Sequence, residues 1–166
     1  CIRDRFAHWD TRPWADNDPD KKNHKTPILG ANDGASGVGA LLEIARLVHQ
    51  QQPELGIDII FLDAEDYGAH DLDNEESWCL GAQYWARNPH VQGYNARFGI
   101  LLDMVGGKNT VFLKESYSEK FAPDVNKKVW KAARKLGYGN LFINEDGGGV
   151  TDDHLFINRL ARIKTI

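Results

Sequence analysis

Residues 57–66 read IDIIFLDAED, a continuous apolar run of strand length that ends in acidic residues. Apolar side chains at nearly every position are typical of a central strand in a parallel sheet, because such a strand is covered on both faces. Residues 98–105, FGILLDMV, repeat the pattern and place Asp103 near the carboxyl end of the run. The two runs predict an α/β fold with a mostly parallel central sheet.

Longer amphipathic segments alternate with these runs. Residues 35–52 have apolar side chains at helical spacing and are followed by Pro53, which favours the end of a helix. Residues 118–136 predict a further helix that stops at Gly137. Short strands are expected at 141–144 and from residue 161 onward. This alternation predicts a three-layer αβα arrangement with helices on both faces of the sheet.

The composition fits one globular domain over residues 1–166, with 42% hydrophobic residues and a formal net charge of -4. No basic stripe indicates a nucleic-acid partner, and we interpret the locally basic residues 120–135 as the solvated face of a helix. No apolar run reaches the roughly 18 residues of a transmembrane segment. Cys1 and Cys79 are too few for a disulfide framework, so each is expected to be a free thiol, with Cys79 buried.

Six acidic residues follow predicted strands or precede predicted helices. Ligand sites in open α/β sheets lie outside the carboxyl ends of the strands, so these side chains are expected to meet in one cleft. Carboxylates 4 Å apart repel by roughly 4 kcal/mol per pair at an effective dielectric constant near 20, unless they share protons or bind a cation. The sequence therefore predicts a divalent metal site. The six residues are Asp33, Glu65, Asp66, Asp103, Asp152 and Asp153.

Taken singly, several of these residues have simpler explanations. Asp33 precedes a helix and could be a plain N-cap, and either Thr151 or Asp152 could cap a short helix in the same way. Glu65 and Asp66 are harder to explain structurally, because neighbours in extended backbone point in opposite directions. One of them could bind metal while the other acts as a general base. His8 and Asp10 alternate along an extended segment, so they could form a metal ligand with its partner, or His8 could lie in a polar surface loop.

The motifs GANDGASG, FLDAEDYG, LLDMVG and TDDH, in this order, resemble those of the zinc aminopeptidases and glutaminyl cyclases. The resemblance implies a zinc-exopeptidase-like fold (phosphorylase/hydrolase-like). It implies that Asp33 and Asp66 bind zinc and that Glu65 is the proton shuttle. Asp66 departs from the more usual Glu and has a shorter reach. Asp103 corresponds to a second-metal ligand in the peptidases and to a catalytic hydrogen-bonding group in the cyclases.

The stretch LLDMVGGKNTVF, the DDH triplet and the long insert at 67–78 look more like the cyclase branch. That branch implies conversion of an N-terminal Gln to pyroglutamate with release of ammonia, using one zinc ion. Asp103 and Asp152 would then act beside Glu65 through hydrogen bonds. Trp78, Asp153 and His154 are expected to contact the substrate, although Trp78 could equally be a core or rim aromatic.

Two alternatives stay open. A two-zinc aminopeptidase would remove N-terminal residues, with His8 and Asp103 completing the second metal site. A catalytically inactive module could use the same scaffold for binding alone. In every case the expected partners are peptide or protein N-termini, and resemblance to bacterial relatives implies an extracytoplasmic location, periplasmic or secreted, although no leader is visible.

The family's last zinc ligand is a His in a Trp-His or Tyr-His motif beyond the strand that begins near residue 161, and no such motif occurs before Ile166. We therefore expect this chain to be part of a longer protein, extended at both ends. By itself it should bind metal poorly, because zinc prefers four ligands that include nitrogen. His154 is a weaker candidate for the missing ligand.

Overall fold

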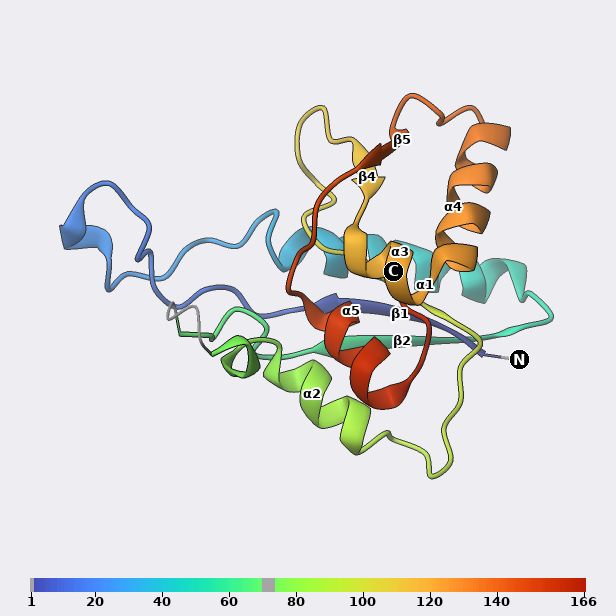
Figure 1. The fold of residues 1–166 in the computed structure, drawn as a ribbon, viewed down its shortest axis with the longest axis horizontal. Coiled ribbons are helices and arrows are strands. Elements are labelled where there is room, and N and C mark those ends of the chain that lie inside the picture. The colour runs from blue at the N-terminus through green and yellow to red at the C-terminus, as the bar shows by residue number, and fades with distance from the viewer. Residues whose placement is uncertain (1, 70–73) are drawn as a thin grey trace.

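The computed structural model describes residues 2–69 and 74–166. Its larger sheet has the order β2-β1-β3, with β1 (Ile2–His8) between β2 (Gly56–Leu62) and β3 (Gly99–Leu101). Both pairings are parallel, and His8 lies opposite Leu62 in the register of β1 and β2. Figure 1 shows β1 and β2 side by side. The carboxyl ends of all three strands therefore lie at the same edge, as predicted for a mostly parallel α/β sheet.

Helices cover both faces of this sheet. On one face, helix α1 (Ala35–Gln51) packs so closely that a Cβ atom on Gly37 would lie 2.0 Å from the Leu102 carbonyl oxygen. On the other face lie α2 (Leu80–Arg87), α5 (Asp153–Phe156) and the π-helix η3 (Ile157–Ala161). There Phe6 of β1 packs edge-to-face on Trp85, with ring centroids 5.3 Å apart. Burial of these apolar side chains forms the main core and the three predicted layers.

A second, two-stranded parallel sheet pairs β4 (Phe112–Lys114) with β5 (Phe142–Asp146). Helices α3 (Ser116–Phe121) and α4 (Pro123–Lys135) connect these strands. Trp130 of α4 packs edge-to-face on Phe142 at 5.3 Å and donates a hydrogen bond to the Ile143 carbonyl. Two short 3-10 helices, η1 (Lys21–Asn23) and η2 (Glu75–Ser77), lie in the loops on the side of the sheet edge where the acids gather.

Three element boundaries differ from prediction. The helix expected over 118–136 is two helices, because Pro123 has no N–H and cannot continue the turn before it, so it starts α4 instead. Strand β3 has three residues rather than eight, and Asp103 lies beyond the ladder. The strand expected from residue 161 is replaced by an isolated bridge between Thr165 and Gly99, because η3 continues to Ala161.

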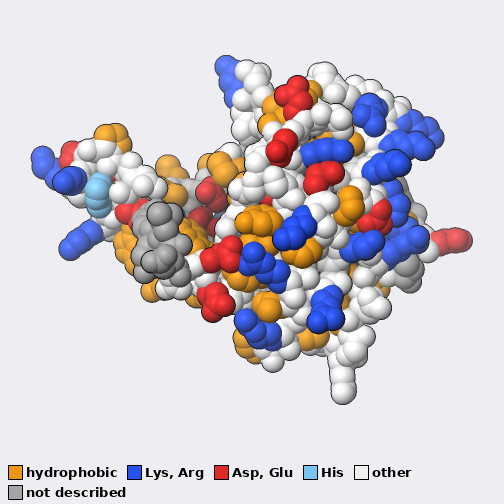
Figure 2. Space-filling view, in the orientation of Figure 1, with side chains coloured by type: hydrophobic (Ala, Val, Ile, Leu, Met, Phe, Trp, Pro, Cys, Tyr) orange, Lys and Arg blue, Asp and Glu red, His pale blue; other side chains and the backbone are white. Residues whose placement is uncertain are grey.

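Other expectations are confirmed. Cys79 is a buried free thiol. The Lys and Arg side chains of α4 are exposed, and Figure 2 shows basic side chains gathered on that side of the molecule. Among the described residues, no helix combines the length and the apolar character needed to cross a bilayer.

Candidate metal and catalytic site

His8 lies at the carboxyl end of the central strand, fully buried among carboxylates. Its Nε2 atom is 3.0 Å from Asp103 Oδ1 and 3.1 Å from Asp33 Oδ1, and its Nδ1 atom is 3.5 Å from Asp10 Oδ1. Burial alone would lower the pKa of His8, but the contacts with Asp10, Asp103 and Asp33 raise it well above its ordinary value. The carboxylates around His8 therefore favour a positive charge at this position.

Asp33 does not cap helix α1. The N-cap is Gly34, with φ at 90°, and no side chain makes a capping hydrogen bond there. Gly34 suits this position because its backbone is left-handed and a Cβ atom would lie 2.3 Å from the Asp10 carbonyl oxygen. The Asp33 carboxylate instead faces His8, which lowers the pKa of Asp33. The plain N-cap explanation of Asp33 is therefore wrong.

Glu65 and Asp66 follow β2 in a turn, where their backbone N–H groups donate to the two oxygens of Asp10 at 3.1 and 3.2 Å. The prediction that their side chains point in opposite directions assumed extended backbone. Because the chain turns here, and Ala64 has a left-handed φ of 53°, both carboxylates face the same pocket. The Cys79 thiol donates to Glu65 Oε1 at 3.4 Å.

The pocket at this edge of the sheet has a volume of about 440 Å³. Acidic side chains dominate its lining, together with one large aromatic ring and a short apolar rim. Figure 2 shows acidic side chains beside the hollow that separates the loop after β1 from the body of the molecule. The lining residues are Asp33, Glu65, Asp66, Ala69, Glu75, Trp78, Asp103, Val150, Thr151 and Asp152.

The protonation of these acids reflects their crowding. Burial, and then the charges of Asp152, Asp153 and Asp66, raise the pKa of Glu65 to about 10. Burial and the neighbouring Asp33 charge raise the pKa of Asp66 to about 6. Burial also raises the pKa of Asp152 to about 6. A bound cation would stabilise the ionised forms of all three groups.

The side chains fit a divalent metal ion. Asp66 Oδ2 and His8 Nδ1 are buried without a hydrogen-bond partner. Imidazole nitrogen and carboxylate oxygen are ligands that zinc accepts. Among the described residues, three groups bring their ligand atoms within 4.8 Å of one another. They are His8 with Asp33 and Asp103, His8 with Glu65 and Asp66, and Glu65 with Cys79 and Asp152.

Of the three residues of the DDH triplet, one lines the pocket and two lie in the interior. Asp152 lines the pocket, and its side chain also accepts from the Asp153 N–H at 2.6 Å, so of the two candidate caps Asp152 is the one that caps α5. Asp153 is fully buried, and both its carboxylate oxygens lack a hydrogen-bond partner. His154 is also buried, with Nε2 3.0 Å from Glu115 Oε2. Neither Asp153 nor His154 lines the pocket.

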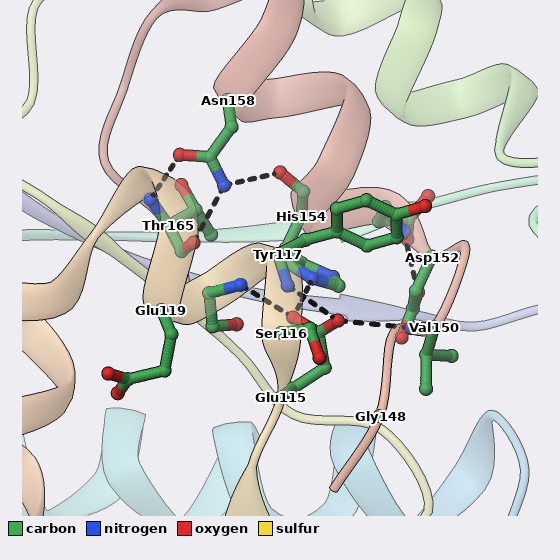
Figure 3. A network of polar contacts seen from close by, with 12 residues as sticks. Glu115, Ser116, Tyr117, Glu119, Gly148, Val150, Asp152, His154, Asn158 and Thr165 are labelled. Carbon is green, nitrogen blue, oxygen red and sulfur yellow. Dashed lines mark hydrogen bonds and ion pairs between the residues drawn. The ribbon is translucent and has the colours of Figure 1, made fainter. Parts of the chain in front are cut away.

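Glu115 is a residue that sequence reasoning missed. Its carboxylate accepts from the backbone N–H groups of Tyr117 and Ser118 at the start of α3, and from the Val150 N–H at 3.0 Å (Figure 3). With His154 as a fourth partner, Glu115 ties α3 to the segment that bears Asp152. The one sequence signal was an acid directly before a helix start, where it can act as the cap.

An α/β sheet with a His and several carboxylates at its carboxyl edge fits the zinc-exopeptidase class of fold, to which solved structures similar to this chain belong. The chain belongs to peptidase family M28, whose sequence model matches residues 5–166.

Solved structures resemble the chain closely. A glutaminyl cyclase of Bacteroides thetaiotaomicron, solved with N-acetylhistamine, is 79% identical, with a TM-score of 0.96 over 99% of this chain and 58% of its own. A leucine aminopeptidase precursor of the same species, strain VPI-5482, gives the same values. A glutaminyl cyclase of Porphyromonas gingivalis is 52% identical, with a TM-score of 0.94 over 99% of this chain and 57% of its own.

Among curated proteins, the uncharacterized protein YfbL of Escherichia coli K12 is 42% identical over 60 residues, which are 36% of this chain and 17% of YfbL. The chain thus spans less than two thirds of the length of each of these relatives.

Proposed function

We propose that the full-length protein is a zinc-dependent glutaminyl-peptide cyclotransferase, an acyltransferase that converts N-terminal Gln to pyroglutamate. The observation that carries the proposal is Glu65, a buried acid with a raised pKa, beside Asp152 and Trp78 in one pocket. A general acid and base that works near neutral pH needs a pKa above that of an ordinary carboxyl group. The 79% identity to a glutaminyl cyclase over nearly the whole chain supports the same choice.

Asp33 and Asp66 are the residues that would hold the zinc ion. Both line the pocket, and one buried oxygen of Asp66 has no hydrogen-bond partner. When bound, zinc supplies Lewis-acid polarisation of an amide oxygen. One ion suffices for this role.

Glu65 would move the proton that the cyclisation requires. The α-amine nitrogen of the substrate forms a bond to its own side-chain amide carbon, and the bond from that carbon to the amide nitrogen breaks. Glu65 takes a proton from the attacking amine and delivers it to the leaving nitrogen, which departs as ammonia. The Cys79 thiol, which donates to Glu65 Oε1, helps to hold the carboxylate in place.

Asp103 and Asp152 would bind the polar groups of the substrate beside Glu65. Each is itself held, Asp103 by His8 Nε2 at 3.0 Å and Asp152 by the Asp153 N–H at 2.6 Å. Groups fixed before the substrate arrives need less reorganisation during the reaction. Trp78 would form the apolar wall along the methylenes of the Gln side chain.

An M28-type aminopeptidase is the second candidate, and one observation favours it. His8, Asp33 and Asp103 bring their ligand atoms together, which is the arrangement expected of a second metal site. A leucine aminopeptidase precursor is also 79% identical to this chain. In this alternative Glu65 would activate a water molecule rather than a substrate amine.

Two peptides distinguish the candidates. The full-length protein, loaded with zinc, is incubated with a Gln-initiated peptide and with a Leu-initiated peptide of otherwise identical sequence. The cyclase releases ammonia from the first and leaves its chain intact, whereas a peptidase releases a free amino acid. Glu65→Gln is the control and should abolish either reaction. Release of leucine without ammonia would overturn the proposal.

The proposal includes an extracytoplasmic location, periplasmic or secreted, where peptide and protein N-termini would be the substrates. It is supported by the bacterial origin of the glutaminyl cyclases that resemble this chain. Fractionation of the source cells, followed by an assay for the cyclase in each fraction, tests the location. Activity confined to the cytoplasmic fraction would contradict it.

A further inference from the structure

Arg12, two residues after Asp10, lies almost buried, with 7% of its surface exposed. Its Nε and one terminal nitrogen donate to the two oxygens of Asp16, at 3.0 and 2.6 Å. Its other terminal nitrogen donates to the carbonyl oxygens of Asp66 and Gly68, at 2.7 and 2.8 Å. These four bonds use four of the five N–H groups of a guanidinium, and Asp16 neutralises its charge.

Residues 10–12 therefore hold the turn that carries Glu65 and Asp66 from two sides. Asp10 accepts from the N–H groups of Glu65 and Asp66, and Arg12 donates to the carbonyl of Asp66 and to that of Gly68. Both peptide groups that flank the Asp66 Cα atom are thus anchored. The direction in which the Asp66 side chain leaves the backbone is fixed by these bonds.

Arg12 also supports the aromatic wall of the pocket. Its guanidinium lies 4.9 Å from the ring centroid of Trp78 and 5.4 Å from that of Trp14, within the range of cation–π attraction. Trp78 packs directly on Gly68, where a Cβ atom would lie 2.0 Å from the indole. The Trp78 ring therefore rests between Arg12 and a backbone position that Arg12 itself holds.

We infer that Arg12 is a positioning residue, which presents the acidic pair and the Trp78 wall to the substrate in a fixed relative geometry. This inference rests on the proposed function, because it assigns Glu65 and Trp78 their parts in one reaction. Lysine cannot replace Arg12, since a single ammonium cannot make a two-bond fork with Asp16 while also bonding two carbonyls and staying within cation–π range of two indole rings.

The first test is Arg12→Lys in the full-length, zinc-loaded protein. The expected result is a loss of kcat/KM of about tenfold to a hundredfold, because small displacements of catalytic groups are costly. Both a lower kcat and a higher KM are expected, with zinc content and circular dichroism unchanged. The matched control is Arg46→Lys, because Arg46 makes a similar two-bond fork with Glu43 on the exposed side of α1. Its kcat and KM should not change.

A stabilising role alone would give a different result. Arg12→Lys would then lower the melting temperature, while kcat per folded molecule and KM kept their wild-type values. That outcome would overturn the inference.

The second test is chemical rescue of Arg12→Ala. Removing the side chain leaves a site between two indoles and the Asp16 carboxylate, which free guanidinium at millimolar concentration should fill. We expect guanidinium to restore KM and the tryptophan emission spectrum, whereas ammonium at the same concentration should not. Failure of guanidinium to restore either quantity would contradict the inference. If Arg12→Ala does not fold, Arg12→Lys still decides the question.

The emission spectrum separates this inference from the proposed function. If the wild-type protein released no ammonia from a Gln-initiated peptide, the proposed function would fail. The spectral change in Arg12→Ala, and its reversal by guanidinium, would still report whether Arg12 positions the two indoles beside it, Trp78 and Trp14.

Discussion

Tyr94 has one hydroxyl proton but lies between two carboxylates, 2.5 Å from Asp4 Oδ1 and 2.8 Å from Asp58 Oδ2. It can donate to only one of them, so the other must carry a proton to make a hydrogen bond. Asp4 is fully buried and its Oδ2 has no partner. Burial, opposed by the Tyr94 bond and assisted by the Asp58 charge, raises the pKa of Asp4 to about 6. This cluster lies toward the amino ends of the strands, away from the acidic pocket.

Replacing Asp4 with Asn should stabilise the protein above pH 6. The folded state holds the Asp4 proton more tightly than the unfolded state, so the wild type loses stability as pH rises from about 4 through about 6. A shift of about two pKa units corresponds to at most roughly 3 kcal/mol. In urea unfolding at pH 8, the free energy of unfolding of Asp4→Asn should therefore exceed that of the wild type by about 1 to 3 kcal/mol. The difference should vanish near pH 4.

The exposed residue Glu54 supplies the control for this prediction. Glu54→Gln removes a carboxylate of the same charge from the surface and should change stability little at either pH. A loss of stability in Asp4→Asn at pH 8 would contradict the account of the Asp4 proton.

Glu115→Gln should loosen the segment that carries Asp152. Burial would raise the pKa of Glu115, but the bonds from His154, Tyr117, Ser118 and Val150 lower it to about 2. The ionised carboxylate therefore stabilises the fold above its unfolded pKa, near 4.5, and this contribution is lost as pH falls toward 2. At pH 7 the variant should lose about 1 to 3 kcal/mol, since it keeps one accepting oxygen instead of two.

Thermal unfolding between pH 7 and pH 3 measures the Glu115 prediction. The gap between wild type and Glu115→Gln should narrow as the pH is lowered. A gap that stayed constant over this range would show that the Glu115 charge does not matter.

At the residue scale, the sequence indicated which acids matter but not what each one contacts. Asp33 could be a cap or a ligand, and only the position of His8 across the edge of the sheet shows that its carboxylate faces the pocket. Glu65 and Asp66 were expected to diverge because the sequence carries no clear sign of the turn at Ala64, a non-glycine residue with a left-handed φ. The bonds from Arg12 to Asp66 and Gly68, and from Val150 to Glu115, join groups far apart along the chain, so no local pattern can reveal them.

Helix α1 approaches the sheet closely at one glycine, Gly37. A Cβ atom on Gly37 would lie 2.0 Å from the Leu102 carbonyl oxygen and 3.0 Å from the Ala7 Cβ, whereas one on Gly39 would meet nothing within 4 Å. Both glycines lie in the same helix, so their helix propensities are equal. The pair therefore separates the effect of packing from that of propensity.

Gly37→Ala should destabilise the protein by about 1 to 3 kcal/mol, because the added methyl group must push α1 away from the sheet. Gly39→Ala should stabilise it by roughly 0.5 to 1 kcal/mol, since alanine is the better helix former. Denaturant unfolding of both variants provides the measurement. Equal effects of the two substitutions would contradict the close contact of α1 with β1.

At the element scale, the apolar strand β2 and the helix α1 were predictable because their patterns are strong. Strand β1 was not predicted, although it is the central strand; only the stretch with His8 and Asp10, at its carboxyl end, was expected to be extended. Its sequence, IRDRFAH, carries Arg3 and Arg5, which are only partly buried, beside the fully buried Asp4. Because Asp4, which accepts a hydrogen bond from Tyr94, and the two arginines interrupt the apolar pattern, hydrophobicity alone does not predict a core strand here. The length of β3 was overestimated for the opposite reason, because apolar residues continue beyond the hydrogen-bonded ladder.

At the scale of the whole molecule, the acidic pocket is a product of topology. His8 is the last residue of β1, Glu65 and Asp103 follow β2 and β3, and parallel pairing brings these strand ends to one edge. The sequence predicted this convergence because each acid lies just after its strand. It also predicted Asp152 in this cleft, but it could not show that the segment at 147–154 comes from the second sheet and is held at the edge by Glu115.

Zinc content tests the central claim, that the carboxylates at this edge of the sheet gather around a metal ion. The full-length protein is dialysed against trace zinc and analysed by elemental mass spectrometry, beside Asp33→Asn as the variant that removes one proposed ligand. We predict one zinc ion per wild-type chain and much weaker binding in the variant. A wild-type protein that retains no zinc, or an Asp33→Asn variant that retains it undiminished, would contradict the account.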